Sequence, residues 1–323
     1  MVMLAMAMGL DSITGEAIMV LGGAIGFSTG TFNMFTTVVA QDIAELPAYS
    51  GLWYRAVCFV VFYIVTNWYL IRYAKKIKKN PTMSPMFDLD QEMKAEEATM
   101  DLEAASELTG RMLAPLVLLV IAFAVIIYGA IVLKWGMAHM AAMFLTYSVV
   151  ADLMIGTPVN TVCKDILDGS KQMLGAAFII GMATAISGIM DAGKITYTIV
   201  HATSELLSGL PPIIIAPGMV LANTLINLFL TSGSGQAVAV MPILIPLADV
   251  LGVTRQTTVL AFNFGDGFCN FILPTSTALM GTLSVTNIPY DRWMRFMWKL
   301  FLIWLVTGCV MTLIAQMIHL GPM

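Results

Sequence analysis

Three polar segments that interrupt apolar stretches hold the side chains best suited to bind a small molecule or an ion. Residues 232–236 (Ser-Gly-Ser-Gly-Gln) form a tip with hydroxyls, bare backbone amides and an amide side chain between two apolar limbs. Residues 26–33 and 265–270 are glycine-containing runs with one asparagine each, and the second run also contains Asp266. Free N–H groups at a helix start favour carboxylates. Hydroxyls and unwound carbonyls favour Na⁺, so either kind of ligand is expected here.

Asp266 lies in the core of the second run, where a charge needs a compensating partner. An acid at the centre of a membrane helix costs roughly 2.5–3.5 kcal/mol on insertion scales. Asp266 could bind a cation, carry a proton or pair with a cationic group of the substrate; alternatively, it caps the helix break. Asn33 and Asn270 can both donate and accept hydrogen bonds. Residues 274–276 (Pro-Thr-Ser) place hydroxyls in the first turn of a restarting helix, which is another potential ion site.

The predicted binding residues come from the tip, the two breaks and the helix restart. The substrate- and ion-binding set is Thr29, Asn33, Ser232, Gly233, Ser234, Gly235, Gln236, Gly265, Asp266, Gly267, Asn270, Pro274, Thr275 and Ser276. Within this set, Na⁺ is expected near Ser232, Ser234, Asp266 and Asn270. No residue is assigned a catalytic role, and no other metal site is expected.

The two breaks lie in corresponding places of two similar stretches of the chain. Each is followed about twenty residues later by a proline, an aromatic-Arg element and a continuous apolar helix. These landmarks are Pro47, Trp53 and Arg55 in the first stretch, and Pro289, Trp293 and Arg295 in the second. Non-helical backbone at membrane depth is tolerated only where protein covers it or it lines a cavity. Paired interrupted helices indicate the binding site of a secondary transporter.

The composition is that of a polytopic α-helical membrane protein. Hydrophobic residues make up 59% of the chain and charged residues only 11%, with a mean hydropathy of +0.85. The apolar runs are continuous rather than alternating, which excludes a β-barrel. The four cysteines lack metal or disulfide spacing, and there is no nucleotide-binding loop or catalytic triad. The sequence therefore predicts neither an enzyme nor an ATP-driven machine, and no cofactor beyond Na⁺ or H⁺ as coupling ion.

The order of apolar and charged segments predicts the topology. Basic clusters follow residue 71 and begin at residue 292, and both are expected on the cytoplasmic side. A polar, acidic linker with a surface helix from Asp88 to Glu107 lies between the first and second spans. The predicted spans are 51–74, 111–133, 138–156, 173–190 and 289–318, with interrupted helices at 14–44 and 254–285, a connector at 158–171, an amphipathic helix at 194–209 and a re-entrant hairpin at 211–251.

The two interrupted helices are predicted to run in opposite directions, as an inverted repeat requires. In the second repeat a hairpin limb precedes the broken helix, and residues 1–10 occupy the same place in the first. We therefore expect residues 1–10 to be the second limb of an incomplete first hairpin in a fragment of a longer chain. The polar groups from Ser28 to Asn33 would then face a void or solvent.

Several runs resemble the YfcC-like branch of the anaerobic C4-dicarboxylate carrier (DcuC-like) family. They are residues 232–249 (SGSGQAVAVMPILIPLAD), 264–270 (FGDGFCN), 273–276 (LPTS) and a first-half run from Asn33 to Gly51. The resemblance covers essentially the whole chain. It implies the ion transporter superfamily fold: two inverted repeats with re-entrant hairpins and discontinuous helices, the first hairpin being incomplete here. Met34 stands where relatives usually have proline, and Thr184 stands where a basic residue is expected.

The resemblance also implies a domain organisation and a mode of action. The transport domain would comprise 1–74 and 211–323, joined by a cytoplasmic linker at 75–110, scaffold helices at 111–190 and an interfacial helix at 191–210. Such proteins are elevator-type homodimers of the bacterial inner membrane, coupled to Na⁺ or H⁺. The bilayer and a small carboxylate or amino-acid substrate are the expected partners, and no nucleic acid is expected.

The residues leave the substrate open. The family name indicates C4-dicarboxylates, yet no Arg or Lys lies within either break in the sequence to hold a carboxylate. The expected substrates are C4-dicarboxylates or related small carboxylates and amino acids. Because Asp266 suits a cationic or zwitterionic substrate at least as well, a basic amino-acid (arginine- or ornithine-like) exchanger is the alternative. A truncated, non-transporting membrane protein is the third alternative.

Overall fold

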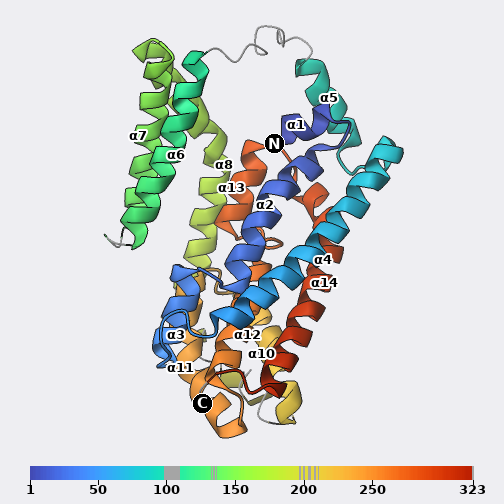
Figure 1. The fold of residues 1–323 in the computed structure, drawn as a ribbon, viewed down its shortest axis with the longest axis vertical. Helices are drawn as coiled ribbons and strands as arrows, with labels where there is room; N and C mark the ends of the chain where they lie inside the picture. Colours follow the sequence, from blue (N-terminus) through green and yellow to red (C-terminus); the bar gives the residue numbers. More distant parts are fainter. Residues whose placement is uncertain are drawn as a thin grey trace. The chain divides into compact units, whose positions relative to one another are not determined.

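The computed structural model describes residues 1–97, 110–131, 133, 135, 137–195, 198, 201–202, 205–206, 209 and 211–321. Every regular element in this part of the chain is a helix (Figure 1). The chain divides into two compact units, one made of residues 1–90 and 175–323 and the other of residues 91–174. The division into transport and scaffold domains stays a prediction.

The smaller unit contains a helical hairpin. Helices α6 (Gly110–Ile131) and α7 (Met137–Met154) pack against each other, with the Tyr147 hydroxyl donating to the Pro115 carbonyl at 3.4 Å. The rings of Phe123 and Phe144 lie 5.9 Å apart between centroids. These contacts pair the start of one helix with the latter half of the other, so the helices are antiparallel, and the predicted hairpin is confirmed. Helix α8 (Val159–Ala192) follows and is continuous, so the predicted connector at 158–171 is helical and runs without a break into the predicted span at 173–190.

In the larger unit, one order of elements occurs twice: a limb, a helix, a break, short helical segments and a long helix (Figure 1). The first occurrence is α1 (Val2–Ala7), α2 (Ser12–Thr29), the π-helix η1 (Met34–Val38), α3 (Val39–Ile43) and α4 (Leu52–Lys79). Helices η2 (Pro81–Met83) and α5 (Phe87–Glu97) follow. The second occurrence, with one more helix at its start, is α10 (Pro212–Asn227), α11 (Gly233–Leu251), α12 (Arg255–Cys269), α13 (Thr277–Val285) and α14 (Tyr290–Met317).

The long helices of the two occurrences run antiparallel. The Tyr54 hydroxyl near the start of α4 donates to the Met311 carbonyl near the end of α14, at 2.6 Å. The Tyr69 hydroxyl, four turns later in α4, donates to the Phe296 carbonyl near the start of α14, at 2.7 Å. Antiparallel long helices are what two inversely oriented repeats would produce.

Aromatic rings fill the space between α4, α12 and α14. Phe62 lies 4.5 Å from Phe268 between ring centroids, and Phe268 lies 4.8 Å from Trp304. The Trp304 indole donates to the Thr66 hydroxyl at 2.8 Å, which satisfies its N–H away from solvent. This core fixes α12, and therefore Asp266, relative to the two long helices.

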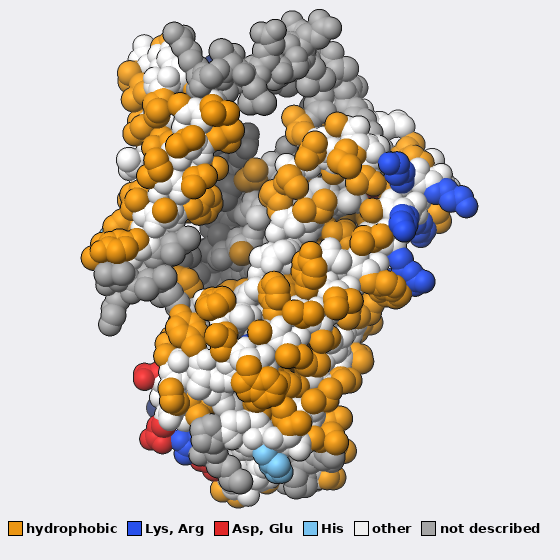
Figure 2. Space-filling view, viewed as in Figure 1, with side chains coloured by type: hydrophobic (Ala, Val, Ile, Leu, Met, Phe, Trp, Pro, Cys, Tyr) orange, Lys and Arg blue, Asp and Glu red, His pale blue; other side chains and the backbone are white. Residues whose placement is uncertain are grey.

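Four helices of the described residues are long and apolar enough to cross a membrane: α2, α4, α11 and α14. Large apolar side chains are exposed on α4 and α14, including Ile64 and Val306. In Figure 2, hydrophobic side chains cover much of the visible surface, and a group of Lys and Arg side chains lies at one edge. The last turn of α4 contributes Lys76, Lys78 and Lys79. An apolar surface of this kind suits contact with lipid.

The observed helix breaks begin later in the sequence than the predicted ones. Helix α2 continues to Thr29 and α12 to Cys269, so Gly26, Gly265 and Gly267 are helical. Helix α2 ends at its C-cap Gly30, which adopts the left-handed conformation with φ 65°, and α12 ends at its C-cap Asn270. The predicted first break at 26–33 contains the observed one at 30–33, whereas the second, predicted at 265–270, is placed several residues early because the non-helical residues are 270–276. The predicted surface helix is confirmed as α5 to Glu97; most of the predicted helix at 194–209 and residues 98–109 lie outside the described residues.

Asp11 joins the first turn of α2 to the end of α4. One carboxylate oxygen accepts from the Thr14 amide at 3.0 Å, and the other accepts from the Tyr73 and Ser84 hydroxyls. We expect Asp11→Ala to lower the free energy of unfolding by about 2–4 kcal/mol, because a helix cap is lost and buried donors lose their acceptor. Thermal unfolding in detergent measures this, with the exposed Asp42→Ala as control. Equal midpoints for the two variants would contradict this role of Asp11.

Candidate functional site

A buried polar cluster joins α10, α11 and α12. The Asp266 carboxylate has no exposed surface, and one of its oxygens accepts from the Asn227 amide at 2.8 Å. The same amide donates to the Gln236 side-chain oxygen at 2.8 Å. The Gln236 amide in turn donates to the side-chain oxygen of Asn223 at 3.2 Å. Buried networks of this kind hold their members in one arrangement.

The start of α11 lies against the other Asp266 oxygen. A Cβ built on Gly233 would lie 2.9 Å from that oxygen and 2.5 Å from the Thr36 methyl group, so only glycine fits here. The positive end of the α11 dipole therefore stabilises the carboxylate. This Asp266 oxygen accepts no hydrogen bond from the described residues although it is buried. It is suited to bind a cation, a proton or an ammonium group.

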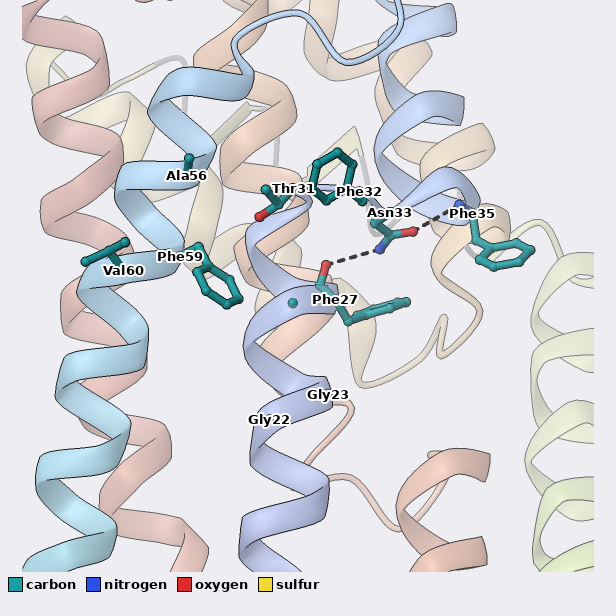
Figure 3. Close-up of a pocket in the computed structure, with 11 residues that line it drawn as sticks. Gly22, Gly23, Phe27, Thr31, Phe32, Asn33, Phe35, Ala56, Phe59 and Val60 are labelled. Carbon is teal, nitrogen blue, oxygen red and sulfur yellow. Dashed lines mark hydrogen bonds between the residues drawn. The ribbon is translucent and has the colours of Figure 1, made fainter. Parts of the chain in front are cut away.

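Asn33 spans the first break. Its amide donates to the Phe27 carbonyl in the last turn of α2 at 3.1 Å (Figure 3). Its side-chain oxygen accepts from the backbone amides of Phe35 and Thr36 at 2.9 and 3.1 Å, which starts η1. Asn33 thus satisfies backbone groups on both sides of the break, as a helix cap does.

The two repeats meet where α2 ends. A Cβ on Gly267 would lie 2.5 Å from the Cα of Ser28, so α12 and α2 are in direct backbone contact. The Asn263 amide, one turn earlier in α12, donates to the Thr37 hydroxyl at 2.9 Å. Thr36 of η1 therefore lies beside Gly233, next to Asp266, and Thr37 of η1 contacts Asn263.

Arg55 lies beside the first break, where sequence analysis places no basic residue. A Cβ on Gly30 would be 2.8 Å from the Arg55 Nη1 atom and 2.3 Å from the Asn263 amide nitrogen. The side chain extends from the start of α4 to the end of α2, so only the fold reveals its position. Neither break contains an Arg or Lys of its own, but α4 places the Arg55 guanidinium beside the first one. An arginine in an otherwise apolar helix is the signal that could have found it.

Several predicted site residues act as local caps. The Ser232 hydroxyl accepts from the Gly235 amide at 3.3 Å, and the Ser276 hydroxyl accepts from the Leu279 amide at 3.5 Å. The Thr29 hydroxyl donates to the Ile25 carbonyl at 2.8 Å. The Asn270 amide donates to the Asp266 backbone carbonyl at 3.0 Å. Ser234, Gly235 and Pro274 are exposed, and Thr275 is half-buried. The Na⁺ site stays a prediction.

An apolar pocket of about 630 Å³ lies between α2 and α4 (Figure 3). Gly22, Gly23 and Gly26 form one wall, and nothing lies within 4 Å of a Cβ built on any of them. Thr31 and Asn33 line the pocket; the expectation of an open first-repeat site holds for the partly exposed Thr31, whereas the Asn33 side chain is buried and hydrogen-bonded. The expectation is wrong for Ser28 and Thr29, which are fully buried, because α12 covers this side of α2.

We expect Asn227→Ala to destabilise the larger unit by about 1–3 kcal/mol, because buried Asp266 and Gln236 would each lose a donor. Asn67→Ala serves as the control, since the Asn67 amide makes one exposed bond, to the Tyr63 carbonyl in its own helix. Thermal unfolding of the two variants in the same detergent measures the difference. Similar midpoints would show that the Asn227 bonds add little to stability.

A family model described as C4-dicarboxylate anaerobic carrier (DcuC) matches residues 1–317. The chain belongs to this family. It is 35% identical over 303 residues to an Escherichia coli (strain K12) protein named "Putative basic amino acid antiporter YfcC", covering 90% of this chain and 59% of that protein. It is 29% identical over 310 residues to an uncharacterized protein of Haemophilus influenzae, and the match covers 96% of this chain and 61% of that protein. The chain thus spans about 60% of the length of these relatives. No solved structure matches it.

The match confirms the predicted resemblance to YfcC-like members of the DcuC family. The family consists of carriers, and this chain contains several apolar helices of membrane-spanning type. The chain is therefore an all-helical polytopic membrane protein of a transporter family, with Asp266 and Arg55 buried where its two broken helices meet.

Proposed function

We propose that the protein is a secondary transporter of small amino acids that carry a carboxylate and a cationic group. The observation that carries this proposal is the Asp266 carboxylate: it is buried where the hairpin tip meets the two broken helices, and one of its oxygens accepts no hydrogen bond from the described chain. Burying an unpaired carboxylate is costly. A bound cationic group would compensate for that cost.

The transport cycle we propose is of the elevator type. The repeated element order and the antiparallel α4 and α14 support an inverted repeat, in which the unit containing Asp266 would move against scaffold helices. The functional form would be a homodimer in the bacterial inner membrane, with residues 75–110 on the cytoplasmic side. The basic residues at the end of α4 support this orientation.

The coupling ion would be H⁺ or Na⁺, held at Asp266 when no cationic substrate group occupies it. Of the residues predicted to bind Na⁺, Ser232 and Ser234 are exposed and Asn270 donates to a backbone carbonyl. Asp266 is the member of that set with an unpartnered oxygen in the described chain. This arrangement favours H⁺ or the substrate cation over a preformed Na⁺ site.

A C4-dicarboxylate is the second candidate substrate, because the family description names it and Arg55 is buried nearby. Two carboxylates would require a second basic group, whereas Asp266 would repel one of them. The name of the Escherichia coli relative refers to basic amino acids. We therefore place amino acids ahead of dicarboxylates.

Uptake by liposomes that contain the purified 323-residue chain tests this proposal. Vesicles preloaded with unlabelled L-arginine should accumulate labelled L-arginine, and excess succinate should leave the rate unchanged. An imposed pH or Na⁺ gradient identifies the coupling ion. Uptake of succinate but not L-arginine would favour the dicarboxylate alternative. If neither is taken up or bound, both substrate proposals are wrong and the non-transporting alternative gains.

A further inference from the structure

We propose that Arg55 binds the carboxylate of the transported amino acid, in a subsite that it shares with Asn263 and Thr37. The proposal rests on the proposed function and adds to it the group that recognises the anionic end of the substrate. The observation is a buried guanidinium with unused donors that lies beside Gly30 and Asn263. Asn263 is one turn of α12 before Asp266, a buried carboxylate with an unused oxygen.

Arg55 is 1% exposed, yet its Nε and Nη1 atoms donate no hydrogen bond within the described part of the chain. Its Nη2 atom makes one long bond, 3.5 Å, to the Gln256 side-chain oxygen. No carboxylate of the described residues forms an ion pair with it. A buried guanidinium without an anion carries an uncompensated charge. An anion that enters this place would therefore be held strongly.

The surroundings of Arg55 suit a carboxylate. Gly30 has no side chain to fill the space beside Nη1, and a Cβ there would also lie 2.3 Å from the Thr37 hydroxyl. That hydroxyl accepts from Asn263 and can still donate to a ligand oxygen. An arginine can present two parallel N–H groups to a carboxylate, which sets its orientation as well as its affinity.

The spacing to Asp266 matches a small zwitterion. Asn263 and Asp266 are three residues apart in α12, so they lie on one face about 4.5 Å apart along the helix axis. Two consecutive residues of η1 lie at the same two positions: Thr36 lies near Gly233 and Asp266, and Thr37 contacts Asn263. A ligand with its carboxylate at Arg55 and its ammonium at Asp266 would neutralise both buried charges. A dicarboxylate would neutralise only one.

An open pocket adjoins the proposed subsite. The 630 Å³ pocket is lined by Thr31, the residue after Gly30, and by Ala56, the residue after Arg55. In Figure 3 both residues face the opening between α2 and α4. Arg55 itself does not line this pocket, so the substrate would reach the guanidinium by displacing the end of α2 at Gly30.

Binding to the purified chain in detergent, measured by calorimetry, tests the inference with L-arginine and agmatine. Agmatine is the same molecule without the carboxylate. The parent should bind L-arginine at least tenfold more tightly than agmatine. Arg55→Gln should weaken L-arginine at least tenfold and leave agmatine unchanged, and Arg55→Lys should be intermediate because lysine lacks the planar fork. Arg72→Gln, in the exposed part of the same helix, should match the parent.

The outcomes separate this inference from the proposed function. Equal affinity of the parent for L-arginine and agmatine would overturn the carboxylate subsite, even if the Arg55 variants fail to fold. Equal weakening of both ligands in folded Arg55→Gln would assign Arg55 a structural role instead. If the parent binds neither of these ligands nor succinate, the proposed function itself fails.

Discussion

Replacing Asp266 with asparagine is expected to lower L-arginine uptake by at least about tenfold while the protein stays folded. Asparagine has nearly the same size, and its side-chain oxygen can still accept from Asn227 at the position of the present 2.8 Å bond. The charge is lost, and with it a charge-assisted bond to the substrate or coupling cation that is worth about 1.5–3 kcal/mol. The defect should therefore appear in uptake and binding rather than in stability.

Uptake across a series of pH values and Na⁺ concentrations measures this effect, together with size-exclusion chromatography of the variant. Asp291→Asn is the matched control, because Asp291 is an exposed acid at the start of α14. A residual activity that no longer responds to pH would identify Asp266 as the proton carrier. Uptake equal to the parent under every condition would reduce Asp266 to a structural residue and would favour the dicarboxylate alternative.

Local patterns predicted the kinds of elements and the place of the first break, but not the register of the second. Gly265 and Gly267 look like helix breakers in the sequence, yet they lie in a continuous helix. Their lack of side chains serves close packing: a Cβ on Gly265 would lie 2.4 Å from Asn223, and one on Gly267 would lie 2.5 Å from Ser28. A glycine that allows helices to touch and a glycine that ends a helix have the same signature in a sequence.

The site was predicted in part, for a related reason. Gln236, Gly233 and Asp266 stand out because they interrupt apolar runs, and the structure brings them together. Asn227 lies in a limb of the predicted hairpin at 211–251 and Arg55 in the predicted span at 51–74, and they join the site only through long-range packing. The exposed serines of the tip were predicted as ligands because of their type, although their side chains do not reach the cluster in this conformation.

Two glycine substitutions should have opposite effects on stability. Gly267→Ala would place a methyl group 2.5 Å from the backbone of Ser28, and because both are parts of helices, α2 and α12 must separate. Overpacking of this kind costs about 1–3 kcal/mol. Gly22→Ala places its methyl group at the open pocket, with nothing within 4 Å. It should stabilise α2 by up to about 1 kcal/mol, because alanine has the higher helix propensity.

The pair also tests whether the contact between the two broken helices forms the binding site. Separating α2 from α12 would move Gly30 away from Asn263 and from the Arg55 guanidinium that lies beside it. Gly267→Ala should therefore lower both the unfolding midpoint and the affinity for L-arginine, whereas Gly22→Ala should lower neither. A Gly267→Ala variant as stable as the parent would show that the helices do not touch at Ser28. One that is destabilised but binds L-arginine normally would show that the substrate does not depend on this contact, and the subsite between Arg55 and Asp266 would then be wrong.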